Sequence, residues 1–196
     1  VDALRAENPS TLFVSAGDNI GASTFTSFIQ NDNPTIDALV AAGLDLAAVG
    51  NHEFDAGFDD LTDRVIPRFG GDEFALGANV YDRVTGEPAL REYVVENVDG
   101  VRVAFIGTVT EQTAAMVSPD GIADIRFGDQ LEAANRVAEQ ITAADEADVI
   151  VLLTHEGAVD ADCTALASED SAYGTLIREA SGDIDAIVSG HTHLPY

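Results

Sequence analysis

Residues 50–55 read Gly-Asn-His-Glu-Phe-Asp, and this stretch decides the fold. It follows an apolar run, residues 46–49, which predicts a buried strand. A glycine and a group of polar side chains directly after a strand are typical of a ligand site in an open α/β sheet, where ligands bind beyond the carboxyl ends of the strands. The same combination recurs at three other strand ends of the chain.

Histidine is concentrated at these strand ends. The chain has four histidines, and all four lie in the polar clusters. Because the carboxyl ends of parallel strands meet at one edge of a sheet, we expect the clusters to form a single site. The other three clusters are Gly17-Asp18 after the run 11–16, His155 after the run 149–153, and Gly190-His191-Thr192-His193 after the run 186–188.

Strands and helices alternate along the chain, which predicts a layered α/β architecture. Residues 97–100 read Asn-Val-Asp-Gly, a turn that joins a strand over 90–96 to one over 101–107 as an antiparallel hairpin. Residues 108–127 show no clear period and predict a loop. The other expected strands cover 11–16, 46–49, 74–80, 149–153 and 186–188, and the expected helices cover 35–42, 58–69, 129–144 and 172–180.

Length and charge limit the function. A chain of 196 residues fits one domain. Its net charge of −26 repels nucleic-acid polymers, but it admits a small phosphate ester if metal ions supply positive charge locally. No apolar run approaches the roughly 18 residues of a transmembrane helix. The single cysteine, Cys163, excludes an internal disulfide, and we assign it no role.

The polar clusters contain the side chains that bind divalent transition metals, namely histidine, carboxylate and carboxamide. A carboxylate such as Asp18 can bridge two ions, and a metal pair can activate water for displacement at phosphorus. Each cluster alone has a plainer interpretation, such as a hydrogen-bonded histidine, a turn or a helix cap. Four clusters that together use every histidine make the purely structural interpretation improbable.

The ordered set of motifs resembles the signature of the calcineurin-like metallophosphoesterase superfamily. Residues 50–55 further resemble the catalytic, N-terminal domain of its 5'-nucleotidase branch. The resemblance extends from Thr11 to His193 and implies two packed mixed β-sheets flanked by helices. It implies two divalent metal ions, of the Mn, Zn or Fe type, and the metal ligands that it implies are Asp18, Asn51, His155, His191 and His193.

The same resemblance assigns a catalytic pair. His52 would not bind metal but would face the phosphate, stabilise its charge and protonate the leaving group. Asp55 would orient the His52 ring. Asp18 would bridge the ions, with His193 in the first metal site and the remaining ligands in the second.

The chain departs from the family pattern at two points. The family opens with a strand ending in Asp-x-His, which ligates the first metal, and no such motif precedes Asp18. No second domain follows Tyr196, whereas in the family a C-terminal domain holds the base. We therefore expect residues 1–196 to be a catalytic domain that is incomplete at its N-terminus, lacks the substrate domain and is impaired as an enzyme.

The resemblance predicts hydrolysis of nucleotide phosphate esters, of the 5'-nucleotidase or 2',3'-cyclic phosphodiesterase type. One alternative is a related hydrolase for a sugar-nucleotide pyrophosphate or a thiosulfonate. Another is a metal-binding module that has lost catalysis. The expected partner is a small phosphate ester and not a nucleic-acid polymer. The resemblance also implies a secreted, periplasmic or cell-wall location.

Overall fold

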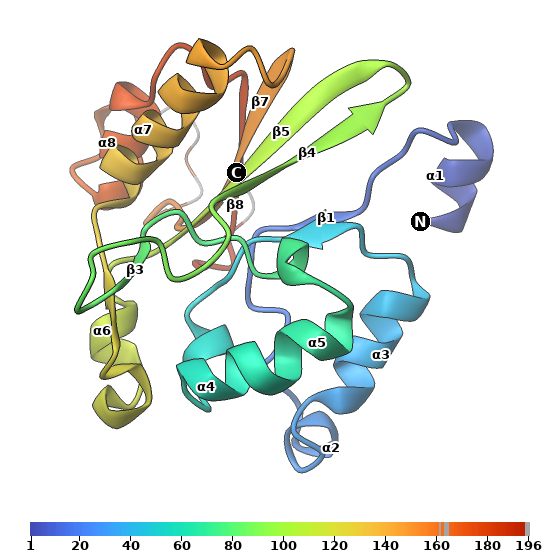
Figure 1. Ribbon diagram of the computed structural model, residues 1–196, viewed down its shortest axis with the longest axis vertical. Helices are drawn as coiled ribbons and strands as arrows, with labels where there is room; N and C mark the ends of the chain where they lie inside the picture. The colour runs from blue at the N-terminus through green and yellow to red at the C-terminus, as the bar shows by residue number, and fades with distance from the viewer. Residues whose placement is uncertain (161, 163–164, 195–196) are drawn as a thin grey trace.

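A computed structural model describes residues 1–160, 162 and 165–194 of the chain. Cys163, to which the sequence assigns no role, lies outside the described residues. Figure 1 shows strands in the middle of the molecule, with one group of helices below them and another at the upper left. No helix in the described part of the chain is long and apolar enough to cross a membrane.

The larger sheet has four strands in the order β4-β5-β7-β8. The hairpin predicted around residues 97–100 is present, because β4 pairs antiparallel with β5. β5, β7 and β8 run parallel, so the sheet is mixed. The strands are β4 (Tyr93–Val98), β5 (Val101–Val109), β7 (Val149–His155) and β8 (Ala186–Ser189).

A smaller parallel sheet pairs β1 (Val14–Ser15) with β2 (Leu46–Ala47). It packs against the larger sheet through buried aliphatic and aromatic side chains that form one cluster. The smaller sheet and the segment beside it contribute Leu46, Ala48 and Leu76, and the larger sheet contributes Val94, Phe105 and Leu153. The predicted architecture of two packed sheets is confirmed.

Helices cover the outer face of each sheet, as Figure 1 shows. α3 (Asn33–Ala41) and α5 (Ile66–Phe69) pack on the smaller sheet. α7 (Gln130–Ala143) and α8 (Ala172–Glu179) pack on the larger sheet. Three of the six buried residues of α7 are alanines, which lets the helix lie close to the strands. Asp129 caps its first turn by accepting from the Glu132 amide at 2.8 Å.

The predicted helix over 58–69 is continuous but not uniform. It comprises α4 (Phe58–Asp60), a π-helical turn (Leu61–Val65) and α5. Pro67 lies at the start of α5 and has no amide hydrogen, so the regular bonding pattern of an α-helix is not available there.

Two expectations were wrong. Residues 74–80 do not form one strand, because the segment crosses between the sheets: the Leu76 amide donates to Ala47 and the Ala78 amide donates to Gly107. Residues 108–127 are not merely a loop. They contain α6 (Thr113–Met116) and β6 (Ile125–Phe127), and β6 pairs antiparallel with β3 (Val80–Asp82).

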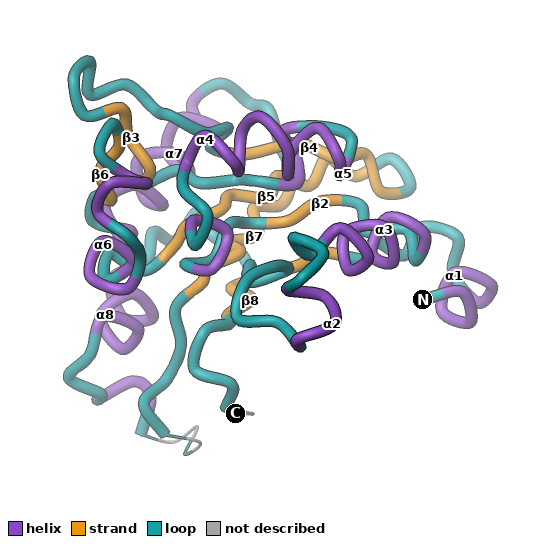
Figure 2. Tube along the Cα trace, turned by 90° about the horizontal axis from the view of Figure 1, so that it is seen from below, coloured by secondary structure: helices purple, strands orange, loops and turns teal. Residues whose placement is uncertain are grey.

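The remaining elements are short. α1 (Asp2–Glu7) lies at the edge of the molecule in both views, and Arg5 attaches it to Asp45 at 2.7 Å. α2 (Phe25–Phe28) precedes α3 and lies on the outside of the fold (Figure 2). Short 3-10 turns cover His52–Phe54, Asp72–Phe74, Pro119–Ile122 and Leu166–Ser168.

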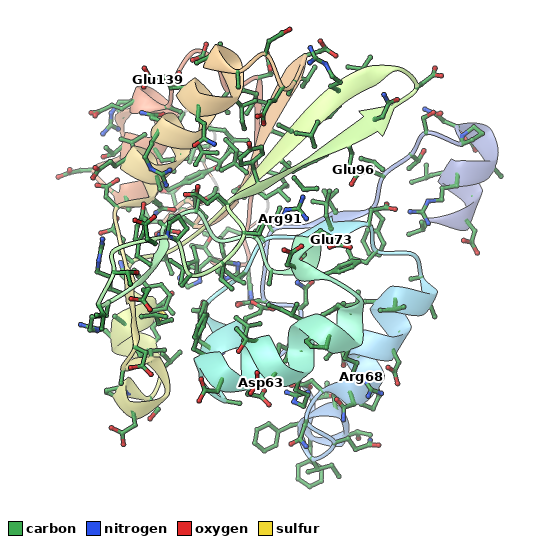
Figure 3. The ribbon with its side chains drawn as sticks, in the orientation of Figure 1. Asp63, Arg68, Glu73, Arg91, Glu96 and Glu139 are labelled. Atoms are coloured by element: carbon green, nitrogen blue, oxygen red, sulfur yellow. The ribbon has the colours of Figure 1, made fainter. Side chains whose placement is uncertain are left out.

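The acidic side chains are spread over separate elements. Figure 3 labels Asp63 on the π-helical turn, Glu96 on β4 and Glu139 on α7, and these side chains lie far from one another on the ribbon. Acidic side chains therefore lie on elements of both layers of the fold.

Candidate metal centre

The loops after β1 and β2 approach each other so closely that glycine is required in both. A Cβ on Gly50 would lie 2.5 Å from the amide nitrogen of Asp18, and one on Gly17 would lie 2.5 Å from the amide nitrogen of Gly50. Ordinary contacts of a Cβ are about 3.5–4.0 Å. Gly17 also has φ of 96°, which favours glycine. The strand-end glycines therefore allow two polar loops to touch.

The carboxylate of Glu53 connects the same two loops. It accepts hydrogen bonds from the backbone amides of Asp18 at 2.9 Å, Asn19 at 2.7 Å and Gly50 at 2.5 Å. The residue is 3% exposed. Burial and the nearby Asp18 carboxylate raise the pKa of Glu53, although its amide donors oppose the shift. Glu53 therefore acts as a buried structural acceptor that fixes the position of Asp18.

Three predicted ligands converge. Ligand atoms of Asp18, His155 and His191 all lie within 4.8 Å of one another. Asp18 follows β1, His155 ends β7 and His191 follows β8, so both sheets contribute to the cluster. A carboxylate with two imidazoles is a donor set that suits zinc, manganese or iron.

His155 is held in the tautomer that a metal ligand needs. Its Nδ1 lies 2.7 Å from the carbonyl oxygen of Ala16. Because a carbonyl oxygen only accepts, Nδ1 carries a proton, so Nε2 is the ring atom that faces Asp18 and is available to a metal ion. Nε2 lies 3.0 Å from Asp18 Oδ2, yet the two atoms do not meet the geometry of a hydrogen bond.

The charges in the cluster depend on one another. Burial disfavours ionisation of Asp18, but His155 and the amide of His52 outweigh it, and the pKa of Asp18 lies below its ordinary value. Burial also disfavours the charged form of His155, but Asp18 outweighs it and raises the pKa of His155. Burial and the charge of His155 lower the pKa of His191.

Unpartnered polar atoms gather at this site. In the described residues, the buried side-chain polar atoms that lack a hydrogen-bond partner are Asn51 Oδ1, His155 Nε2 and Thr192 Oγ1. Buried polar groups are normally paired, because leaving one unpaired costs about 1–3 kcal/mol. All three lie in or beside the predicted ligand set, so the residues present fit a bound cation.

His52 and Asp55 lie next to the cluster. The His52 amide donates to Asp18 Oδ1 at 3.0 Å, which anchors the residue to the metal ligands. Its Nδ1 lies 2.9 Å from Asp55 Oδ2, so the contact expected between these side chains is present. The 3-10 turn over His52–Phe54 brings positions i and i+3 together.

His193 lies apart from the other predicted ligands. It is exposed and is not in the group whose ligand atoms lie within 4.8 Å. Both His191 and His193 have positive φ, 74° and 57°, so the backbone is not that of a regular strand at either residue. Its assignment to a first metal site stays a prediction.

Two supporting residues were not identified from the sequence. Glu53 lies inside the quoted stretch, and its position three residues after Gly50 is the signal that suggests it caps that turn. Gln130 lies at the start of α7 and is buried. It donates to Glu156 at 3.3 Å and accepts from Thr154 at 3.0 Å, so it holds both neighbours of His155.

A set of metal-binding side chains at the edge of two packed sheets, beside a histidine–aspartate pair, defines a hydrolase with a candidate metal centre. Comparison with known proteins agrees. The chain belongs to the calcineurin-like phosphoesterase family, which it matches over residues 1–195. Members of this family generally use divalent metals.

Individual relatives give the same class. The chain is 38% identical over 199 residues to Endonuclease YhcR of Bacillus subtilis (strain 168), covering 96% of this chain and 16% of that protein. It is 33% identical over 197 residues to a 5'-nucleotidase of Vibrio vulnificus (strain CMCP6), covering 98% of this chain and 34% of that protein. The chain thus spans about a third or less of these relatives.

A solved structure is also similar. The calcineurin-like phosphoesterase YfkN from Bacillus subtilis superposes with a TM-score of 0.77 at 28% identity, covering 98% of this chain and 61% of that chain. The fold and the family are therefore shown by both sequence and structure.

Proposed function

We propose that the protein hydrolyses phosphate esters of nucleotides, as a 5'-nucleotidase or a 2',3'-cyclic phosphodiesterase. The observation that carries the proposal is the cluster of Asp18, His155 and His191 directly beside the His52–Asp55 pair. Similarity to a 5'-nucleotidase over 98% of the chain supports the substrate class.

Asp18, Asn51, His155 and His191 would hold one divalent ion. Asp18 would be shared with a second ion, for which His193 is a further ligand. Bound ions of this kind supply Lewis-acid catalysis and positive charge at the phosphate. The orphaned oxygen of Asn51 and the free Nε2 of His155 support this ligand set.

His52 would act on the phosphate ester from beside the ions. Asp55 accepts from Nδ1, so it fixes the ring and leaves Nε2 as the working atom. As a water oxygen bonds to phosphorus and the ester bond breaks, a protonated Nε2 would donate a hydrogen bond to a phosphoryl oxygen and pass its proton to the leaving oxygen. The nucleoside then departs as a neutral alcohol.

The test separates His52 from the metal ligands. Phosphate release from AMP and bound metal are measured for the wild type, His52→Ala and His155→Ala, each with added Mn²⁺. His52→Ala should lower turnover about 10²–10³-fold, the usual effect of removing one transition-state donor, and should keep its metal. His155→Ala should lose metal and activity together. Loss of metal in His52→Ala would instead make His52 a ligand.

A second candidate function is cleavage of phosphodiesters in nucleic acids. It is favoured by 38% identity to an endonuclease, and it conflicts with the expectation that no polymer is bound. The net charge of −26 disfavours a polyanion. Parallel assays with AMP and a single-stranded oligonucleotide distinguish the two, since we expect phosphate from AMP and an intact oligonucleotide.

We also propose that the protein acts outside the cytoplasm, in the periplasm, at the cell wall or after secretion. The resemblance to the 5'-nucleotidase branch supports this location. Fractionation of the native cells, followed by detection of the protein, tests it, and recovery from the cytoplasm alone would contradict it.

A further inference from the structure

The strand β4 forms one edge of the larger sheet. The sheet order places β5 on one side of β4 and no strand of the described chain on the other. Figure 1 shows the β4–β5 hairpin projecting toward the upper right of the molecule. An edge strand presents backbone amides and carbonyls that can pair with another extended chain.

The register of the hairpin identifies the backbone groups that face outward. The Gly107 amide of β5 donates to the Glu92 carbonyl, and this pair lies one step beyond the first pair of the β4–β5 register. In an antiparallel pair, residues that bond to the partner strand alternate with residues that do not. The residues of β4 whose amides and carbonyls point away from β5 are therefore Tyr93, Val95 and Asn97.

Most of these outward groups are open. The Tyr93 carbonyl accepts from the Arg91 guanidinium at 3.1 Å, which occupies the first of them. On that side, nothing in the described part of the chain bonds to the backbone of Val95 or Asn97. A groove of about 470 Å³, lined by residues 91–95 and Glu146, lies beside the strand. The outer edge of β4 is therefore accessible.

The edge matches an extended chain. Its outward backbone groups recur at every second residue, a spacing of roughly 6.5–7 Å that another strand shares. The side chains of Tyr93 and Val95 pack on the helix-covered face of the sheet, whereas Val94 belongs to the cluster between the two sheets. An added strand would continue both faces, because its own side chains alternate in the same way.

The charges along the edge favour a basic partner. Glu96 lies on β4 and Glu146 lines the groove, and neither forms an ion pair with the basic residues that the structure describes. Arg91 does not offset them, because Asp72 accepts from it at 2.9 Å. A second copy of the chain would bring a further net charge of −26 and the same acidic edge, which disfavours self-pairing.

We propose that the outer edge of β4 binds an extended, basic segment of another protein, which adds to the larger sheet as a fifth strand. Backbone hydrogen bonds with Val95 and Asn97 hold the segment in register. Lysine or arginine side chains of the segment lie opposite Glu96 and near Glu146, where they meet acidic groups without a cation. This interaction does not depend on catalysis at the metal centre.

Two substitutions at one position test the backbone pairing. Val95→Pro removes the outward amide, and proline is tolerated at such positions of an edge strand. Val95→Thr is the matched control, because it keeps the amide and the branched side chain. The probe is the blocked hexapeptide Thr-Lys-Val-Val-Lys-Thr, which reads the same in both strand directions. In calorimetric titrations, Val95→Pro should weaken binding about two- to tenfold, as expected for loss of one hydrogen bond. Val95→Thr should match the wild type.

The charge preference has its own test. Glu96→Gln should weaken binding of the lysine peptide about two- to fivefold, the effect of losing one cross-strand charge pair. The peptide Thr-Glu-Val-Val-Glu-Thr should bind more weakly than the lysine peptide, and the difference should shrink at high salt. Equal binding of the two peptides at low salt would overturn the assignment of a basic partner.

Amide hydrogen exchange gives a readout that does not need a variant to fold. With the lysine peptide bound to the wild type, exchange should slow at Val95 and Asn97 and stay unchanged at Val94 and Glu96, which already bond to β5. Equal protection at all four residues, or equal peptide binding by Val95→Pro and Val95→Thr, would overturn the proposal. Sedimentation of the wild type without peptide should show a monomer, and a dimer that Val95→Pro abolishes would assign the edge to a second copy instead.

Discussion

Gly50→Ala tests the close approach of the two loops. The new Cβ would lie 2.5 Å from the Asp18 amide nitrogen and 2.8 Å from Cε1 of His155, and real Cβ atoms essentially never lie within 3.0 Å of another heavy atom. The nearest atom is the side-chain oxygen Oδ1 of Asp18, and the next is the backbone amide nitrogen of Asp18, which cannot rotate away as a side chain does. The Asp18 loop must therefore move, and it is the loop that Glu53 holds.

The magnitude follows from two costs. Forcing a methyl group into a packed site costs about 1–3 kcal/mol, and losing a hydrogen bond to a charged acceptor costs about 1.5–3 kcal/mol. Their combined effect is about 2.5–6 kcal/mol, which lowers Tm by roughly 5–24 °C for a chain of this size. Because the shift displaces a ligand, metal affinity should also fall about 10–100-fold.

The assay compares Gly50→Ala with Gly182→Ala. A Cβ on Gly182 meets nothing within 4 Å, and its φ lies outside the positive range, so this control should stay within about 0.5 kcal/mol of the wild type. Thermal unfolding of the metal-free proteins by circular dichroism gives stability, and Mn²⁺ titration gives affinity. If Gly50→Ala matches Gly182→Ala in both, the two loops do not touch as described.

Three other changes have definite expected outcomes. Asp32→Asn should lower the free energy of unfolding at neutral pH. Burial raises the pKa of Asp32, but hydrogen bonds from Ser23, Ser27 and Gly21 outweigh it and hold the pKa below 3.8. The stabilisation from the ionised carboxylate is therefore complete above pH 3.8 and is lost as the pH falls through the lowered pKa. Urea unfolding at several pH values checks this, and a difference from wild type that does not shrink in acid would contradict it. Arg102→Gln should raise the pKa of Asp148 from about 2 toward 3.8, as an NMR titration of the carboxyl carbon would show, and an unchanged value would contradict the contact at 2.8 Å. Gln130→Ala should lower the free energy of unfolding by about 1–3 kcal/mol, because the buried hydroxyl of Thr154 loses its acceptor and Glu156 Oε2 loses a donor. Glu139→Ala, on the exposed face of the same helix, should change it little.

The sequence predicted the convergence of the ligands well, because the carboxyl ends of strands are local features of the chain. Asp18, His155 and His191 meet where the strand-end argument predicts. The catalytic and metal-binding roles stay predictions, as does the impairment of this chain. Sequence reasoning could not assign a partner to Glu53, because its donors are backbone amides that every residue except proline carries.

The errors have a different origin. The apolar segment 74–80 has the composition of a strand, but its hydrogen bonds go to two different sheets, and a pattern of side chains does not report the partner of each amide. The exposure of Phe28 was likewise not predicted, because aromatic residues in a helix are usually placed in the core by default.

The origin of the ligands in two sheets links metal binding to folding. Asp18 is attached to the smaller sheet, and His155 and His191 are attached to the larger one. An ion held by all three binds only when the sheets are docked, so it stabilises the docked state by about 2.7 kcal/mol at a free concentration 100 times its Kd. With the ion bound, the two sheets would open together in one cooperative unfolding event. Amide hydrogens on β1 and β2 would then exchange with solvent at the same opening free energy as those on β7 and β8.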